Sequence, residues 1–217
     1  MRPRSGQAIG GNGRDQRGRE ARYGDTVSQR AGVFASKFAR HEGRKTREIR
    51  AMDDRQDKGY RGDAAQFFVA GELCRRKLVA VVTMGNCPNT DILVSNAAGT
   101  RFCHVQVKTF VPGNRTVSVG MKSQKDYGSN FFWVLAGIPE ADSQREFEYY
   151  VVPSAEMAKA VTTSFDLWAS SPGAKGQRRD ANTKVRTIVL PPRVEPSGWT
   201  LDPFRNDWAR ITKALGA

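Results

Sequence analysis

The sequence predicts an α/β domain in which a mixed central β-sheet is flanked by helices. Three observations support this prediction. An Ala-rich, apolar run over residues 62–77 is typical of a buried helix. Short β-branched and aromatic runs follow it, mostly separated by Gly, Pro or Asn, as strands and turns are. The chain closes on a helical pattern near residues 203–215. Contiguous strands with helices before and after them favour one sheet with helices packed on it.

The expected elements run in this order. The first helix ends in Arg75, Arg76 and Lys77, which suit a helix C-terminus. Six strands are then expected, over Leu78–Met84, Thr90–Ser95, Arg101–Phe110, Thr116–Met121, Phe131–Ile138 and Phe147–Val152.

The last third of the chain is predicted to hold two helices and a short strand. Ser154 begins a helix that continues to about Val161, residues 170–181 form a loop, and a strand is expected over Thr187–Leu190. Asp202 and Pro203 are suited to begin the final helix. Its apolar residues recur at one-face spacing, and we expect them to pack together: Phe204, Trp208, Ile211 and Leu215.

The charge balance indicates a polyanionic partner. The 217 residues include 35 Lys+Arg and 22 Asp+Glu, a net charge of +13 with a pI of about 10.1. Nucleic acid is the first expectation for such a partner, and an acidic membrane surface is the second. The longest apolar run, Phe131–Ile138, has eight residues, so no membrane-spanning helix is expected. The three cysteines have no zinc-site spacing, and we interpret them as buried, reduced thiols of a cytoplasmic protein.

Two regions differ in composition. Residues 1–58 hold 15 Lys+Arg and 8 Asp+Glu and few aliphatic residues, which predicts a basic, largely disordered or weakly helical arm. Residues 59–217 form the expected α/β domain. The arm is either a solvated tail or a segment that lies along phosphates, and in the second case its candidate contacts are Arg44, Lys45 and Arg47.

The most informative stretch is a predicted β-hairpin. Residues 96–99, Asn-Ala-Ala-Gly, are turn-like and join two short strands. Because strand residues alternate faces, His104, Gln106 and Lys108 share one face and Cys103, Val105 and Val107 the other. A turn centred on residues 97–98 places Asp91 diagonal to Gln106, and one centred on residues 98–99 places it directly opposite. In either register their side chains lie within about 5–8 Å.

This hairpin face carries groups suited to phosphodiester hydrolysis. Asp91 and the amide oxygen of Gln106 are hard oxygen ligands, and with the backbone carbonyl of Val107 and waters they complete a Mg²⁺ site, for which Mn²⁺ is a substitute. Lys108 is placed to hold or deprotonate the attacking water and to offset developing negative charge.

The order of helix, Pro-x-x-Asp and Val-Gln-Val-Lys-Thr resembles the PD-(D/E)XK nuclease superfamily. It is most similar to the branch with group I intron homing endonucleases and Holliday-junction-resolvase-like proteins. The resemblance implies a restriction-endonuclease-like core and a Mg²⁺-dependent endonuclease acting on DNA. It assigns Asp91 as the central metal ligand, Gln106 as the second ligand and Lys108 as the catalytic lysine. It adds a helix residue at the position of Gln66.

Two residues depart from the family pattern, because Gln66 and Gln106 stand where carboxylates are usual. Asp63 or Glu72 are the alternative helix carboxylates. A catalytically weak or inactive relative that binds nucleic acid therefore stays an alternative, as does a protein-interaction module of a defence or toxin system. Cutting both strands needs two sites, so by analogy a homodimer is possible. Candidate phosphate contacts beyond the hairpin are Arg115, Lys122 and Lys125.

Overall fold

The computed structural model of the chain describes residues 58–85 and 87–217. The predicted arm over residues 1–58 lies outside the described residues except for its last one, and so do Arg44, Lys45 and Arg47. Residues Asp57–Ala217 form one compact unit. None of the helices in the described ranges combines the length and the apolar character that crossing a membrane requires.

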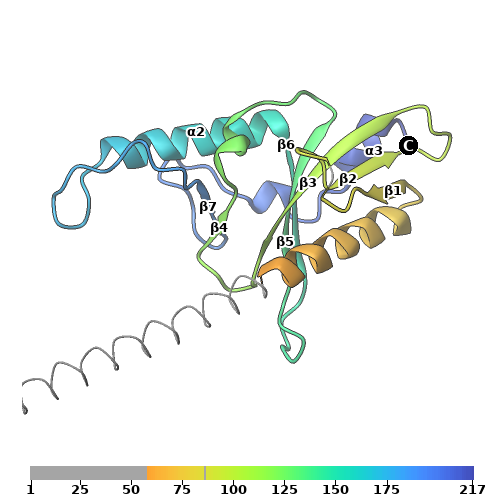
Figure 1. Cartoon of the computed structure of the whole chain (residues 1–217), viewed down its shortest axis with the longest axis horizontal. Coiled ribbons are helices and arrows are strands. Elements are labelled where there is room, and N and C mark those ends of the chain that lie inside the picture. Colours follow the sequence, from red (N-terminus) through yellow and green to blue (C-terminus); the bar gives the residue numbers. More distant parts are fainter. Residues whose placement is uncertain (1–57, 86) are drawn as a thin grey trace, which may run out of the picture. The chain divides into compact units, whose positions relative to one another are not determined.

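A five-stranded sheet is the centre of this unit (Figure 1). Its spatial order is β1-β2-β3-β5-β6, and β3 runs parallel to β5 while the other neighbours are antiparallel. The mixed α/β class predicted from the sequence is therefore confirmed. The strands are β1 (Val79–Val82), β2 (Ile92–Ser95), β3 (Phe102–Phe110), β5 (Phe131–Gly137) and β6 (Glu148–Pro153). A separate two-stranded sheet pairs β4 (Thr116–Ser118) with β7 (Thr187–Val189).

Helices cover both faces of the sheet. A helix over residues 58–75 precedes β1, α2 (Ser154–Ser170) follows β6, and α3 (Ala209–Leu215) lies near the end of the chain. Two short 3₁₀ helices, η1 (Met121–Gln124) and η2 (Asp202–Phe204), lie in the connections.

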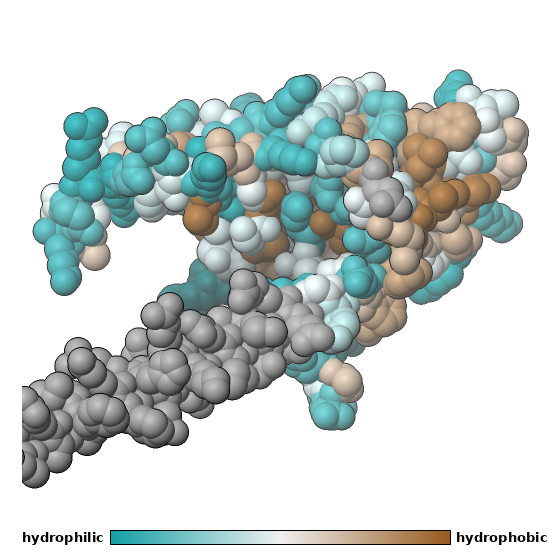
Figure 2. All heavy atoms as spheres, in the orientation of Figure 1, coloured by the Kyte–Doolittle hydropathy of each residue, from teal (hydrophilic) through white to brown (hydrophobic). Residues whose placement is uncertain are grey.

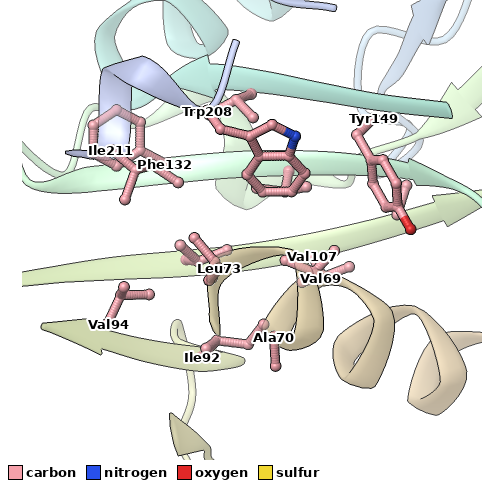
Figure 3. Packing of buried hydrophobic residues seen from close by; sticks show 14 of the residues in the cluster. Val69, Ala70, Leu73, Ile92, Val94, Val107, Phe132, Tyr149, Trp208 and Ile211 are labelled. Carbon is pink, nitrogen blue, oxygen red and sulfur yellow. The ribbon is translucent and has the colours of Figure 1, made fainter. Parts of the chain in front are cut away.

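One sheet face packs against helix 58–75 and α3. Val69 and Leu73 of the first helix, Trp208 just before α3 and Ile211 of α3 belong to one buried cluster with the inward residues of β2, β3 and β5, as Figure 3 shows. The guanidinium of Arg76 lies 4.8 Å from the Trp208 ring centroid, which ties the end of the first helix to α3. The predicted alternation along β3 is confirmed here, because Cys103, Val105 and Val107 all lie in this cluster.

The opposite face carries a second core. Met157 and Val161 of α2 pack with Trp133, Tyr150 and Ile188, and η2 closes this cluster. The elements that cover this face do not extend to the β1 side of the sheet, where Val81 is 55% exposed and Phe102 is 49% exposed. Hydrophobic surface is accordingly visible around this end of the sheet in Figure 2. Residues of β3 that point to this face therefore stay accessible beyond the reach of α2.

The C-terminal helix differs from the prediction. A single helix near 203–215 was expected, but η2 ends at Phe204, Arg205 bridges to Tyr150 in extended conformation, and α3 begins at Ala209. Phe204 therefore packs in the α2-side core, whereas Trp208, Ile211 and Leu215 pack on the other face. The chain crosses from one face of the sheet to the other beside β6. The four apolar residues therefore do not form a single packing face, although their spacing fits a helix.

Three further expectations need correction. The helix expected to end near Val161 continues to Ser170, because packing of its buried side outweighs the low helix propensity of the Thr-Thr-Ser run at 162–164. The strand expected over Thr116–Met121 ends at Ser118, and Met121 begins η1. Cys103 is buried, but Cys74 and Cys87 are exposed free thiols.

Candidate active site

The β2–β3 hairpin sets the register of the candidate site. Ile92 pairs with Val105 and Leu93 with His104, so Asp91 lies directly opposite Gln106. This register corresponds to a turn centred on residues 98–99, where Gly99 adopts a φ of 66° that favours glycine. The Asn96 side chain supports the turn by accepting the Thr100 N–H at 2.9 Å. The turn chemistry thus brings Asp91 to the same sheet face as Gln106.

Asp91 is held at the start of β2 by both its backbone and its side chain. Its N–H donates to the Val105 carbonyl at 2.9 Å, and its carbonyl accepts the Thr83 N–H at 2.9 Å. Its Oδ2 accepts the Val107 N–H at 2.7 Å and a second hydrogen bond from the Gln106 side-chain amide. The carboxylate is therefore fixed between a strand backbone and the neighbouring amide.

The electrostatic environment of Asp91 reflects its burial. Desolvation raises the pKa of this carboxyl above its ordinary value, and the Val107 N–H, the Lys108 charge, the Gln106 amide and the Lys122 charge each oppose that rise. Burial makes ionisation of this carboxyl group unfavourable, and the nearby donors and lysine charges only partly offset that effect. It favours a bound cation or a proton close to its oxygens.

Lys108 lies two residues after Gln106 on the same face of β3 and is half-buried. Its Nζ is 6.0 Å from the ring centroid of Trp133 on β5. Burial lowers the pKa of Lys108, the charge of Asp91 opposes this, and the charge of Lys122 lowers it further. The neutral amine, which can accept a proton from water, is thus more accessible than in an exposed lysine.

Lys122 lies closer to this site than its sequence position suggests. It is carried by η1, and its Nζ donates to the Pro88 carbonyl at 2.6 Å, in the loop that leads to Asp91. Its charge acts on both Asp91 and Lys108. Two lysines from separate segments therefore flank one carboxylate, a pattern suited to an anionic ligand.

His104 and Thr90 extend the site. Thr90 is buried, and its Oγ1 lies 3.0 Å from Nδ1 of His104. This contact links the residue before Asp91 to the strand that carries Gln106. Strand alternation predicts His104 on the face of Gln106 and Lys108, but no local pattern predicts its contact with Thr90. The role of Thr90 was missed, because nothing in its local sequence separates an orienting hydroxyl from an ordinary strand threonine.

The helix candidates lie apart from this cluster. Helix 58–75 packs on the face lined by Val105 and Val107, opposite to the face of Gln106 and Lys108. Gln66 is half-buried and Asp63 is exposed, and neither side chain makes a hydrogen bond or ion pair with another described residue. The structure thus brings neither of them to Asp91.

Glu72 is occupied on the helix surface. Its two carboxylate oxygens accept hydrogen bonds from Arg75 and Arg76, each at 2.7 Å. Burial alone would raise the pKa of Glu72, but its arginine partners outweigh burial and lower it. The Glu72 carboxylate, six residues after Gln66, is therefore neutralised by Arg75 and Arg76.

The other predicted phosphate contacts are more distant from the cluster. Arg115 is exposed at the start of β4, where its carbonyl accepts the Leu190 N–H at 2.9 Å. Lys125 is exposed with its Nζ 5.2 Å from the Tyr127 ring centroid. Among the three lysines and arginines predicted after the hairpin, Lys122 is the one that the described contacts connect to Asp91.

The Asp91 carboxylate and the carbonyl oxygens beside it are the candidate ligands for a divalent cation. Asp91 Oδ1 accepts no hydrogen bond from a described residue, and Oδ2 is the oxygen that Val107 and Gln106 engage. The Val107 carbonyl points to the same side of β3 as its N–H, toward Asp91, because the two groups of one strand residue share a side. Across the described ranges there is no cluster of three or more His, Cys, Asp or Glu suited to a metal. The donor set therefore holds a single carboxylate.

Comparisons with known proteins found no matching family model, no matching curated protein and no matching solved structure. The restriction-endonuclease-like identity of the core stays a prediction, and functional inference rests on the geometry of the hairpin face.

Proposed function

We propose that this protein is an endonuclease that hydrolyses phosphodiester bonds in DNA at the hairpin face of β2 and β3. One observation carries the proposal: the Asp91 carboxylate is held by Val107 and Gln106, with Lys108 next on the same face. A fixed carboxylate can hold a metal ion, and a half-buried lysine beside it can position water and offset the negative charge that develops on the phosphoryl group.

Asp91 is the proposed centre of a Mg²⁺ site, with Mn²⁺ as a substitute. Asp91 Oδ1, the Val107 carbonyl and the Gln106 amide oxygen would be the protein ligands, and the Gln106 amide would turn its oxygen inward from the hydrogen-bonded arrangement. When bound, the cation would polarise a phosphoryl oxygen and favour deprotonation of water. Gln106 would therefore orient Asp91 through its N–H in the cation-free state and ligate the cation through its oxygen in the bound state.

Lys108 is the proposed water-positioning residue. Its lowered pKa favours an amine lone pair that can accept a proton from the attacking water. The water oxygen forms a bond to phosphorus, the bond from phosphorus to the leaving sugar oxygen breaks, and that oxygen takes a proton from solvent. Lys122, which donates a hydrogen bond to the Pro88 carbonyl, is the proposed contact for a phosphate beside the one that reacts.

The test is cleavage of plasmid, linear, branched and single-stranded DNA by the full chain in Mg²⁺, in Mn²⁺ and in chelator. We expect metal-dependent products. Asp91→Ala should lose at least about 10²-fold in rate. The matched variant Asp142→Ala, at an exposed carboxylate, should cleave as the parent does. Intact substrates under every condition, or equal rates for the two variants, would refute the proposal.

A second candidate function is DNA binding without cleavage. The single carboxylate among the described site residues favours it, because hard cations prefer more than one charged oxygen ligand. In that case Asp91→Ala binds DNA as tightly as the parent or more tightly, since repulsion of the phosphates is removed. This alternative is excluded if the parent makes a metal-dependent cleavage product and Asp91→Ala does not.

A further inference from the structure

A pocket of about 460 Å³ lies between α2 and β7, and no step of the proposed hydrolysis uses it. Its walls are largely apolar and aromatic: Val161, Phe165 and Trp168 come from α2, and Val185 and Val189 from the β7 segment. Hydrophobic surface is visible on the underside of α2 in Figure 2. The two aromatic rings lie 5.6 Å apart between centroids and are nearly parallel, with 27° between their planes.

The pocket also contains buried polar groups with unused hydrogen-bonding capacity. Ser164 is 8% exposed, and its buried hydroxyl has no hydrogen-bond partner among the described residues. Glu195 is 6% exposed, and its Oε1 accepts the Val189 N–H at 2.6 Å. Its second oxygen accepts no hydrogen bond from a described residue. Leaving a buried hydroxyl unsatisfied is unfavourable, so a ligand that pairs with it is favoured.

Two arginine side chains lie at the pocket: Arg186 lines it, and Arg179 packs on the Trp168 ring. The segment 171–186 carries five Lys or Arg and one Asp. Arg179 lies with its guanidinium 4.9 Å from the Trp168 ring centroid, and its Nη1 donates to the Trp168 carbonyl at 3.2 Å. The ligand indicated by these observations is flat and apolar on its faces, polar at its edge and joined to negative charge.

The pocket is connected to the hairpin site through η1. Arg186 lines the pocket, and its Nε donates to Oε1 of Gln124 at 2.7 Å. Gln124 is the last residue of η1, and Lys122 stands two residues earlier on the same turn. A nucleic-acid strand whose phosphate lies at Lys122 can therefore direct a neighbouring nucleotide toward α2.

We propose that the pocket between α2 and β7 binds one unpaired nucleobase of the DNA strand held at the hairpin site. The proposal rests on the proposed function and deepens it by naming the substrate class as single-stranded or locally unpaired DNA. The base stacks on Trp168 in the place of the Arg179 guanidinium, which then lies beside the backbone phosphate. The Ser164 hydroxyl and the free Glu195 oxygen meet the hydrogen-bonding edge of the base.

The experiment measures binding of short single-stranded DNA to the full chain carrying Asp91→Asn, which prevents cleavage under the proposed function. The oligonucleotides have about 12 nucleotides, and an abasic residue is moved along them one position at a time. We expect one position at which the missing base weakens binding about tenfold, since stacking on an aromatic ring contributes about 1–3 kcal/mol per base.

Variants assign this effect to the pocket. Adding Trp168→Ala should weaken binding of the intact strand about tenfold and remove the sensitivity to the abasic position. Ser164→Ala should weaken binding severalfold without lowering the melting temperature, because the hydroxyl it removes is unsatisfied in the fold. Leu167→Ala, at the neighbouring residue that is 40% exposed and does not line the pocket, should behave as the parent.

Two failures are distinguishable. Equal affinity for every abasic strand, or unchanged sensitivity in Trp168→Ala, overturns the base pocket while cleavage by the unmodified chain leaves the proposed function standing. Absence of DNA binding together with absence of cleavage overturns both.

Discussion

At the residue scale, ionisation of the half-buried Asp91 carboxyl group lowers the stability of the folded chain. Its folded-state pKa is raised, so between its unfolded and folded values the folded chain binds more protons than the unfolded chain. The stability contributed by Asp91 is therefore full at low pH and is lost as pH rises through the folded pKa. Proteins commonly lose some folding stability by holding functional groups in unfavourable surroundings.

Asp91→Asn should remove that loss. The amide oxygen can still accept the Val107 N–H, and no charge is desolvated. We expect the melting temperature of the variant to exceed that of the parent at neutral pH, by about 2–4 °C for each kcal/mol gained. The difference should shrink as pH falls below the ordinary Asp value. Thermal unfolding at several pH values measures it, and a difference that grows toward low pH contradicts this explanation.

Under the proposed function, the uncharged side chain of Gln106 limits the affinity for the cation. Replacing it by Glu adds a second carboxylate opposite Asp91, so the Mg²⁺ concentration that gives half-maximal cleavage should fall about tenfold. In chelator the two carboxylates repel each other, and the melting temperature should drop and recover on adding Mg²⁺. Gln144→Glu, in an exposed loop away from both proposed sites, serves as the control. An unchanged Mg²⁺ requirement in Gln106→Glu would argue against a cation at this position.

At the element scale, replacing glycine by alanine should have opposite effects on stability in the hairpin turn and in the first helix. Gly99 has φ of 66°, so Gly99→Ala should destabilise the fold by about 1–2 kcal/mol, although its Cβ meets no atom. Gly71 lies exposed inside helix 58–75 with equally open space, and Gly71→Ala should stabilise by about 0.5–1 kcal/mol. Urea unfolding of both variants measures the two shifts. Shifts of the same sign would contradict the assigned turn conformation.

The elements also show what the sequence could predict. Strand alternation and the Asn-Ala-Ala-Gly turn are local signals, and they placed Asp91 and Gln106 on one face with two possible registers. The break after Phe204 was not predictable, because its spacing to Trp208 fits a helix although the two side chains pack on opposite faces of the sheet. The position of Lys122 near Asp91 depends on a tertiary contact to Pro88 that no local pattern reports.

At the scale of the whole molecule, the charge is divided between segments. Residues 1–58 carry 15 basic and 8 acidic side chains, more than half of the net excess of the chain. This division predicts that the N-terminal segment contributes to approach and affinity, whereas chemistry belongs to the hairpin. A homodimer stays a prediction, and cutting of unpaired DNA by one site does not require it.

Neutralising Arg44, Lys45 and Arg47 together as Gln should lower the affinity for DNA and flatten its salt dependence. Each phosphate that is no longer neutralised by a side chain reduces the slope of log K against log salt by about 0.9 for duplex DNA or about 0.7 for single strands. The single-turnover rate at saturating protein should stay unchanged. Lys159→Gln, on the exposed side of α2, should alter neither quantity. Equal slopes for the triple variant and the parent would remove these residues from the interface.

The most direct test of the central claim is the single-turnover rate of DNA cleavage by Lys108→Met beside Lys125→Met. Both changes remove one ammonium group, but Lys108 lies next to Asp91 and Gln106, whereas Lys125 is exposed near Tyr127. We predict that Lys108→Met loses about 10²–10⁴-fold in rate with an unchanged melting temperature, and that Lys125→Met stays within a few fold of the parent. Equal rates for the parent and Lys108→Met would contradict the assignment of this hairpin face as the active site.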